Sequence, residues 1–344
     1  MRRFLSIPAS WLYTAGVTIR HALYDHHLLP SVAVQVPTIC VGNLAVGGTG
    51  KTPHVEYIVR LLMAKGYRVA VLSRGYKRKT HGFVLADETA TARTIGDEAM
   101  QLHTKFPDLA VAVCESRVLG VRLLSRKVEN LDVVVLDDAM QHRGIQCGLT
   151  ILLTPYDRLY IDDHMLPWGT LRDLPSRALK ADMVVVTKCP DTIQPIDMRV
   201  IHNRLHLPTY QHLYFSGLHY GAIQPEGIPL IITGIAHPEY MIEHVQRLFP
   251  HADALTFADH HVYTGKDVAA IISRATNYDY VLTTEKDAQR LRLTDLESQL
   301  LRQGKQLAVL PIEVKMLHEH ECFDQQILHY VREHTPQRPS NNDK

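Results

Sequence analysis

A glycine-rich turn between an apolar run and a helical pattern constrains this chain more than any other feature. The apolar run 36–41 leads into a turn with the sequence Gly47-Gly48-Thr49-Gly50-Lys51-Thr52. Backbone N–H groups of such a turn, with a helix N-terminus behind them, cradle phosphate oxygens. In that arrangement Lys51 reaches the β- and γ-phosphates and the Thr52 hydroxyl binds Mg²⁺. The segment therefore predicts a binding site for a nucleoside triphosphate.

The turn departs from the P-loop pattern at one position, because Ala45 stands where the pattern places its first glycine. Gly47 and Gly48 keep the backbone permissive. The alternative is a flexible glycine loop that binds nothing. The strand before the turn and the helix after it are the context that the P-loop motif requires, and they favour the P-loop.

Composition narrows the possible functions. A length of 344 residues suggests about two domains, and a formal net charge of +1 predicts no bulk affinity for nucleic acid. The five cysteines lie far apart without a C-x-x-C pair, which is typical of reduced thiols in the cytoplasm. No apolar run approaches the ~18–20 residues of a membrane-spanning helix. No protein partner is evident from the sequence.

Residues 1–30 predict an amphipathic helix, with Ser6 as its cap and Pro8 in its first turn. Its apolar positions fall on one helical face: Trp11, Leu12, Ala15, Ile19, Ala22 and Leu23. This apolar stripe could pack on the protein's own core. It could also lie in a membrane surface, with Arg2 and Arg3 towards lipid phosphates. The pattern alone favours the core.

The N-terminal half alternates strands and helices. We expect strands at 36–41, 68–72, 110–114, 133–136, 149–153 and 183–187, with helices at 53–65, 97–105 and 116–126. Most of these strands are Val- and Leu-rich without polar alternation, which suits strands covered on both faces. The pattern predicts a P-loop NTPase-type α/β fold with a doubly wound, mostly parallel sheet. Ligands of such a sheet bind at the carboxyl ends of its strands.

The chain divides after this first unit. We expect a P-loop domain over 31–208, a linking ribbon over 209–228, a second, smaller α/β domain over 229–335 and a flexible tail over 336–344. The second domain should contain strands at 228–233, 253–257, 278–282 and 306–310, with helices at 237–248 and 266–275.

Two carboxylates end an apolar strand. The run 131–136 leads directly into Asp137 and Asp138. In P-loop proteins an Asp at this position holds Mg²⁺, and adjacent carboxylates repel each other unless a cation or donors neutralise them. The alternative is an exposed acidic turn, which the nearby P-loop disfavours.

A second carboxylate and a histidine pair also follow strands. Asp97 begins a predicted helix, so its default role is an N-cap. Asp259 precedes His260 and His261 in a loop of the second domain. A carboxylate paired with an imidazole can take a proton from a hydroxyl near neutral pH. Such a pair would require the second domain to close over the substrate.

Several further residues lie near predicted strand ends. The arginines there, whose forks suit phosphate, are Arg74, Arg117, Arg143 and Arg172. The segment 283–287 is either a helix cap or part of the site. The segment 186–190 has a strand and Lys188, but Pro190 stands where a guanine-reading Asp is needed, and this argues against a GTPase.

In sequence order, these motifs resemble the tetraacyldisaccharide 4′-kinase family, the lipid A kinases of Gram-negative bacteria. The matching segments are 41–53, 73–76, 96–98, 136–142, 166–172 and 259–260. The resemblance implies ATP-dependent phosphorylation of the 4′-hydroxyl of a tetraacyl-glucosamine disaccharide 1-phosphate in lipid A (lipopolysaccharide) biosynthesis. It also implies a peripheral enzyme on the cytoplasmic face of the inner membrane, with the N-terminal stripe facing lipid.

The resemblance also implies residue roles. By analogy, Asp97 is the base, and His260, chosen over His261, is its partner. Lys51 belongs to the catalytic set and to the P-loop that binds ATP. The metal residues are Thr52, Asp137 and Asp138, and the substrate or phosphate residues are Arg74, Arg117, Arg172 and Gln141.

Two positions depart from the family pattern. Ala139-Met140 stands where relatives often have Gly-Phe, and Asp173 stands where they often have Glu. The shorter Asp173 argues against a direct metal ligand there. The rival interpretation is a P-loop switch or metallochaperone-type NTPase that acts on a partner protein.

Overall fold

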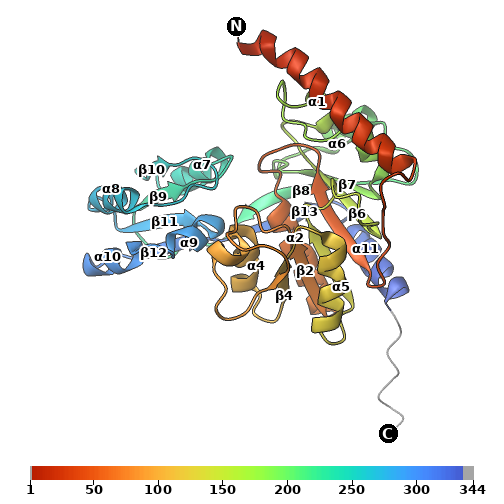
Figure 1. Ribbon diagram of the computed structural model, residues 1–344. Coiled ribbons are helices and arrows are strands. Elements are labelled where there is room, and N and C mark those ends of the chain that lie inside the picture. Colours follow the sequence, from red (N-terminus) through yellow and green to blue (C-terminus); the bar gives the residue numbers. More distant parts are fainter. Residues whose placement is uncertain (1, 336–344) are drawn as a thin grey trace.

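The computed structural model of the protein describes residues 2–335, which form two α/β units, each built around its own β-sheet (Figure 1). The larger unit carries the N-terminal helix and the smaller unit lies beside it. The fold class expected from the sequence is therefore present. The expected tail 336–344 lies outside the described residues.

The larger sheet has the strand order β13-β8-β7-β6-β1-β5-β2-β4-β3. Its strands are β1 (Thr38–Asn43), β2 (Val69–Ser73), β3 (Val84–Leu85), β4 (Ala110–Val113), β5 (Val133–Asp137), β6 (Leu149–Pro155), β7 (Met183–Thr187), β8 (His212–Tyr220) and β13 (Ile312–Leu317). Only the edge strands β3 and β13 pair antiparallel with their neighbours. All six strands expected in the N-terminal half are present, and β1 lies two residues later than predicted.

Helices cover both faces of this sheet, which explains why its inner strands are apolar on both sides. One face packs on α2 (Lys51–Ala64), α4 (Asp97–Lys105) and α11 (His320–His334), and the other on α5 (Arg117–Lys127) and α6 (Pro195–Leu205). Short helical segments α3 (Ala92–Ile95), η1 (Tyr160–Asp162) and η2 (Pro175–Lys180) lie in the connections. β5 and β7 are buried along their whole lengths.

The winding direction reverses at β1. From β1, α2 carries the chain towards β2 on one side, whereas β6, β7 and β8 extend the sheet on the other side. The crevice at such a reversal is where open α/β sheets bind ligands. The glycine-rich turn follows β1 and therefore lies at this crevice.

The smaller sheet is parallel, in the order β10-β9-β11-β12. Its strands are β9 (Pro229–Thr233), β10 (Asp253–Thr256), β11 (Tyr280–Thr284) and β12 (Leu307–Leu310). α8 (Gly265–Ala275) and α10 (Leu296–Arg302) contribute to one apolar core, and α7 (Glu239–Leu248) to the other. α9 (Glu285–Leu291) begins directly after β11.

The structure corrects the expected domain boundaries in two places. Nine residues of the expected ribbon 209–228 form β8, which pairs in parallel with β7 inside the larger sheet. The C-terminal segment also returns to that sheet, because β13 pairs with β8 and Phe323, Ile327 and Val331 of α11 are buried in its core. Two segments thus cross between the units, and the Gly221 N–H donates to the Pro311 carbonyl at 2.9 Å where they meet.

The N-terminal helix α1 (Arg2–Asp25) starts before Ser6, the expected cap, and it contains Pro8 in its interior. Its apolar stripe does not pack on the core, which corrects the interpretation favoured from the pattern alone. Trp11, Leu12 and Ile19 are 69%, 76% and 61% exposed. The docked face of the helix is narrow and carries two buried polar residues, Ser10 and His21.

Among the helices of residues 2–335, none combines the length and the hydropathy needed to cross a bilayer.

Candidate active site

One cavity of about 990 Å³ lies between the carboxyl ends of the two sheets. The larger unit lines it with the turn after β1, the loops after β2 and β4, and the end of β5. The smaller unit lines it with the loops after β9 and β10 and the start of α9. Every site residue that we predicted from the sequence lines this cavity: Gly47, Gly48, Thr49, Gly50, Lys51, Thr52, Arg74, Asp97, Arg117, Asp137, Asp138, Gln141, Arg172 and His260.

The glycine-rich turn has the backbone that its composition predicts. Gly47 and Gly50 have φ values of +107° and +85°, which residues with a Cβ rarely adopt. α2 begins at Lys51. The Thr187 hydroxyl at the end of β7 donates to the Thr49 carbonyl at 2.9 Å and fixes the turn against the sheet. The N-terminus of α2 therefore faces the cavity as a phosphate site.

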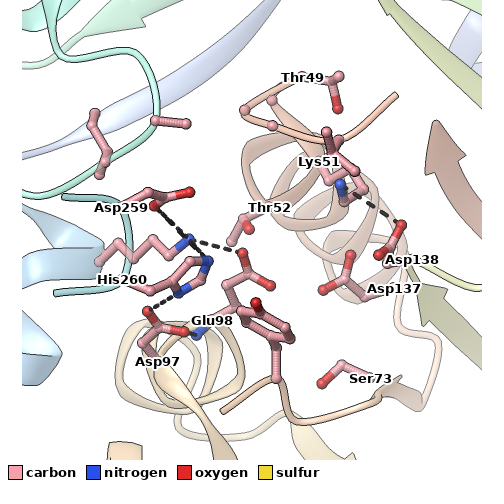
Figure 2. A pocket seen from close by; sticks show the side chains of 18 of the residues that line it. Thr49, Lys51, Thr52, Ser73, Asp97, Glu98, Asp137, Asp138, Asp259 and His260 are labelled. Carbon is pink, nitrogen blue, oxygen red and sulfur yellow. Dashed lines mark hydrogen bonds and ion pairs between the residues drawn. The ribbon is translucent and has the colours of Figure 1, made fainter. Parts of the chain in front are cut away.

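A cluster of opposite charges surrounds Asp138. Lys51 Nζ lies 3.7 Å from Asp138 Oδ1 (Figure 2). It also lies 3.2 Å from Asn43 Oδ1. Arg172 donates to both carboxylate oxygens of Asp138, with Nη1 2.8 Å from Oδ2. Burial would raise the pKa of Asp138, but Lys51 and Arg172 lower it to about 2. Asp138 is therefore an anion that holds both cationic side chains at this end of the cavity.

Asp137 lies in an environment that disfavours its charged form, unlike that of Asp138. It is buried, and its Oδ1 has no hydrogen-bond partner among the described residues. Burial, together with the nearby charges of Glu98 and Asp138, raises the pKa of Asp137 to about 7. A cation next to this carboxylate would relieve both penalties.

The donor set fits Mg²⁺, because the Asp137 and Asp138 carboxylates and the Thr52 hydroxyl are the hard oxygen ligands that this ion prefers. Within residues 2–335, no group of three or more acidic, His or Cys side chains forms a complete metal cage. Mg²⁺ usually binds through one or two carboxylates together with substrate phosphates. The three residues therefore suit a metal that arrives with a nucleotide.

Asp97 and His260 meet across the two units. Asp97 Oδ2 lies 2.8 Å from His260 Nδ1, and Figure 2 shows both side chains on the wall opposite Lys51. Asp97 is the first residue of α4 and Gly96 is the N-cap, so the default cap role for Asp97 is wrong. Burial would raise the pKa of Asp97, but the hydrogen bond to His260 and the charges of Lys286 and Arg290 hold it below its usual value. Asp97 is therefore an ionised carboxylate that can accept a proton.

The choice between the adjacent histidines follows from the geometry. His261 Nε2 lies 3.1 Å from Asp267 Oδ2, and its ring stacks on Phe257 with centroids 4.9 Å apart. His261 therefore belongs to the loop of the smaller unit, whereas His260 faces Asp97.

Lys286 is a site residue that the sequence analysis did not single out. Its Nζ lies 3.1 Å from His260 Nε2 and 3.0 Å from Glu98 Oε1. The segment 283–287 serves both roles that we considered, because the Thr284 hydroxyl also caps α9 by accepting from the Asp287 N–H at 2.9 Å. The signal available in the sequence was the position of this segment directly after a strand.

The four predicted substrate or phosphate residues differ in whether their side chains already bind other groups of the protein. Arg117 is buried and donates to the Cys114 carbonyl at 2.9 Å, and burial lowers its pKa. Gln141 donates to the Asn43 carbonyl at 2.6 Å, and Arg172 binds Asp138. Arg74 is exposed at the cavity and, among the described residues, has no side-chain hydrogen bond or ion pair. Arg74 is thus the member of the set with an uncommitted guanidinium.

The side of the cavity next to the two segments that cross between the units, here called the hinge side, is apolar and aromatic. The sequence analysis also missed this feature. The hinge side is lined by Leu218, Tyr220, Met241, Leu310 and Ile312. Next to them, Lys188 Nζ lies 4.6 Å from the centroid of the Tyr240 ring. A flat apolar ligand group would fit here better than a charged one.

A P-loop at a central parallel strand, with paired aspartates on the adjacent strand, defines a P-loop nucleotide-binding protein of the α/β class. Residues 2–332 match the family model described as tetraacyldisaccharide-1-P 4′-kinase. The chain belongs to this family, as the resemblance predicted.

Individual relatives agree with the family match. The chain is 45% identical to the tetraacyldisaccharide 4′-kinase of Bacteroides thetaiotaomicron, over 95% of this chain and 93% of the relative. It is 42% identical to the tetraacyldisaccharide 4′-kinase of Flavobacterium johnsoniae, over 96% and 98%. A solved structure of LpxK from Aquifex aeolicus, described as an "apo" form in complex with ATP, has a TM-score of 0.74 at 26% identity, covering 96% of this chain and 99% of that one. The P-loop NTPase-type fold predicted from the sequence is confirmed.

Proposed function

We propose that the protein transfers the γ-phosphoryl group of ATP to the 4′-hydroxyl of a tetraacyl-glucosamine disaccharide 1-phosphate, a step of lipid A biosynthesis. Family membership over residues 2–332 and the ATP complex of the solved relative support this activity. The observation in this chain that carries the proposal is the pairing of Asp97 with His260 in the same cavity as Lys51 and Asp138.

The phosphate end of the cavity holds the nucleotide. N–H groups of the turn 47–52 bind phosphate oxygens, and Lys51 binds the β- and γ-phosphates. Thr52, Asp137 and Asp138 would hold Mg²⁺, and the bound ion would neutralise charge on the phosphates. The apolar hinge side of the cavity binds the adenine ring of ATP. Catalysis at this end consists of positioning and charge neutralisation.

The opposite wall activates the acceptor. Asp97 takes the proton of the 4′-hydroxyl while its oxygen attacks the γ-phosphorus, and the β–γ bridging oxygen leaves with ADP. His260 donates to Asp97 and orients the carboxylate. Arg74, whose guanidinium is uncommitted, binds an anionic group of the substrate.

The decisive experiment follows the label from γ-labelled ATP. We expect transfer to the lipid disaccharide acceptor, with little release of phosphate to water in its absence. A P-loop switch that acts on a protein partner would instead release phosphate without labelling the lipid. Label found only in inorganic phosphate would reject the kinase proposal.

The exposed stripe of α1 supports a peripheral position on the cytoplasmic face of the inner membrane. Trp11, Leu12 and Ile19 present apolar side chains to the surroundings, as an interfacial helix does. We expect W11E/L12E to abolish sedimentation with vesicles that contain anionic lipid. L301E is the matched control, because Leu301 is equally exposed, at 69%, on the smaller unit. Equal sedimentation of both variants would remove α1 from the membrane proposal.

A further inference from the structure

Lys286 lies in the cavity but has no assigned role in the proposed reaction. It is the second residue of α9, on the smaller unit, and its side chain reaches into the cavity between the units. There its ammonium contacts His260 from the same unit and Glu98 from α4 of the larger unit, at 3.1 and 3.0 Å. Lys286 therefore joins the two walls at the point where Asp97 and His260 meet.

The contact with His260 fixes which ring nitrogen carries the proton. An ammonium donates hydrogen bonds and accepts none. At 3.1 Å from Lys286 Nζ, Nε2 of His260 must therefore be the acceptor. The proton of the neutral ring then resides on Nδ1, and Nδ1–H donates to Asp97 Oδ2 at 2.8 Å. A doubly protonated ring would direct an N–H at the ammonium, so Lys286 opposes that form.

The ammonium keeps its charge in this setting. Burial would lower the pKa of Lys286, but the carboxylates of Glu98, Asp97 and Asp259 hold it above its usual value. Asp259 Oδ1 lies 4.0 Å from Lys286 Nζ. Lys286 thus supplies permanent positive charge next to the Asp97–His260 pair.

We propose that Lys286 is a positioning residue for phosphoryl transfer, which holds His260 as the Nδ1–H tautomer so that Asp97 remains ionised and aimed at the acceptor hydroxyl. This inference rests on the proposed function, in which Asp97 is the base. It adds a requirement for α9, because α9 carries the ammonium that contacts both His260 and Glu98 of α4.

Other charged side chains also face Asp97 and His260, and a test of Lys286 must leave these side chains unchanged. Arg290 Nε lies 3.6 Å from Asp97 Oδ2, and Lys77 Nζ lies 3.5 Å from the His260 carbonyl. Glu98 and Asp259 complete the charged surroundings, and the ring of Tyr76 meets that of His260 edge-on at 4.9 Å. The Asp97 carboxylate, which only accepts, also favours a proton on Nδ1. Among these groups, Lys286 is the one that keeps Nε2 unprotonated.

The first test reads the tautomer without any turnover. ¹⁵N spectra of the full-length protein, with the His260 signals assigned by their loss in H260Q, should show a protonated Nδ1 and an unprotonated Nε2 at pH 7. K286M should lose this pattern, and K286R, which keeps a charged donor, should retain it. An Nε2–H tautomer or a doubly protonated ring in the wild-type protein would overturn the inference.

The second test uses the pH profile of kcat/KM for lipid phosphorylation. A cation this close shifts a carboxylate's titration by about one unit or more, so K286M should move the acidic limb about one pH unit higher. The loss should be at least about tenfold on the acidic limb, and activity should recover above it. K286R should stay within a few tenths of a unit of wild type.

K266M, at an exposed lysine of α8, is the matched control and should leave the profile unchanged. A uniform loss across all pH values in K286M would indicate a merely structural role and reject the inference, as would an unshifted limb. If the wild-type protein transfers no phosphate to the lipid, the proposed function fails, whereas the NMR experiment still decides the tautomer.

Discussion

The two ends of the cavity are built in different ways. At the phosphate end, Lys51, Asp138 and Arg172 belong to one unit and contact each other around a buried strand of the larger sheet. At the base end, Asp97 comes from the larger unit, whereas His260 and Lys286 come from the smaller one. The first end is thus complete within one sheet, and the second exists only where two sheets meet. We therefore expect substitutions to separate nucleotide binding from the proposed proton abstraction.

Ion pairs also connect the two units. Lys105 of α4 lies 2.6 Å from Glu56 of α2 and 2.7 Å from Glu285 of α9. One ammonium therefore binds a carboxylate from each unit. This links the start of α9, which carries Lys286, to the helix that follows the P-loop.

The largest expected effect is at the base end. D97N should reduce kcat by about 10²–10⁴-fold, because it removes the proton acceptor. The dissociation constant for ATP, measured by calorimetry, should stay within about twofold, because Asp97 does not belong to the phosphate end. A D97N enzyme with near-normal kcat would show that proton abstraction does not depend on this carboxylate.

The next effect is at the phosphate end. K51M removes a charged donor to the phosphates, which we expect to cost about 1.5–3 kcal/mol and thus about 10–150-fold in ATP affinity. Arg172 still binds Asp138 in this variant, so the carboxylate keeps a partner. Calorimetry with ATP measures the loss. An unchanged affinity of K51M for ATP would contradict the proposal that the phosphate end of the cavity binds the nucleotide.

His54 supports the P-loop through hydrogen bonds of its buried ring. His54 Nδ1 lies 2.7 Å from the Gly50 carbonyl and Nε2 lies 2.9 Å from Ser216 Oγ on β8. Burial lowers the pKa of His54 from 6.5 to about 4. The unfolded chain therefore binds this proton first as the pH falls, so the stabilising effect of the neutral ring is complete above about pH 6.5 and is lost progressively down to about pH 4.

Urea unfolding at two pH values tests this linkage. The wild-type free energy of unfolding should fall by about 2 kcal/mol more than that of H54Q between pH 7.5 and pH 5. The comparison with H54Q removes the contributions of the other titrating groups. An equal fall in both proteins would show that His54 does not carry this pH dependence.

The smallest expected effect is at a single contact between the units. The Tyr240 hydroxyl donates to Asp157 Oδ2 at 2.9 Å, and both residues are exposed in part. Y240F should change kcat/KM by no more than about threefold, because an exposed hydrogen bond contributes little. Y240L, which also removes the ring beneath Lys188, should have the larger effect. The reverse order would assign the main role to the hydroxyl.

The same division explains what the sequence could predict. The P-loop and Asp137–Asp138 are local signals, each a strand followed by the residues that act, and the structure places them in one cavity as expected. The pairing of Asp97 with His260 joins residues 163 positions apart. Local patterns suggested a carboxylate–imidazole pair, but they carry no information about which residues meet, and only the family resemblance assigned the pair to these two. Lys286 had no periodic signature that separates it from a surface lysine.

Two errors in the fold have similar causes. β8 was expected as a ribbon because its pattern is not continuously apolar, yet it lies second from the edge of the larger sheet, between β7 and β13. The return of β13 to this sheet is a pairing between strands about ninety residues apart, which no local pattern specifies. The stripe on α1 was ambiguous for another reason, since an apolar face looks the same whether protein or lipid covers it.

The contacts of α1 tie the helix to the phosphate end. The Tyr13 hydroxyl donates to the Arg172 carbonyl at 3.0 Å, and His21 Nε2 lies 2.5 Å from Asp173 Oδ1. Arg20 donates to the Gln141 carbonyl at 2.7 Å. The helix therefore also supports the segment that carries Arg172, whose guanidinium binds Asp138. A shortened protein made without its first two dozen residues would lose these contacts. Its weaker catalysis in detergent would then be mistaken for a simple failure to reach the bilayer.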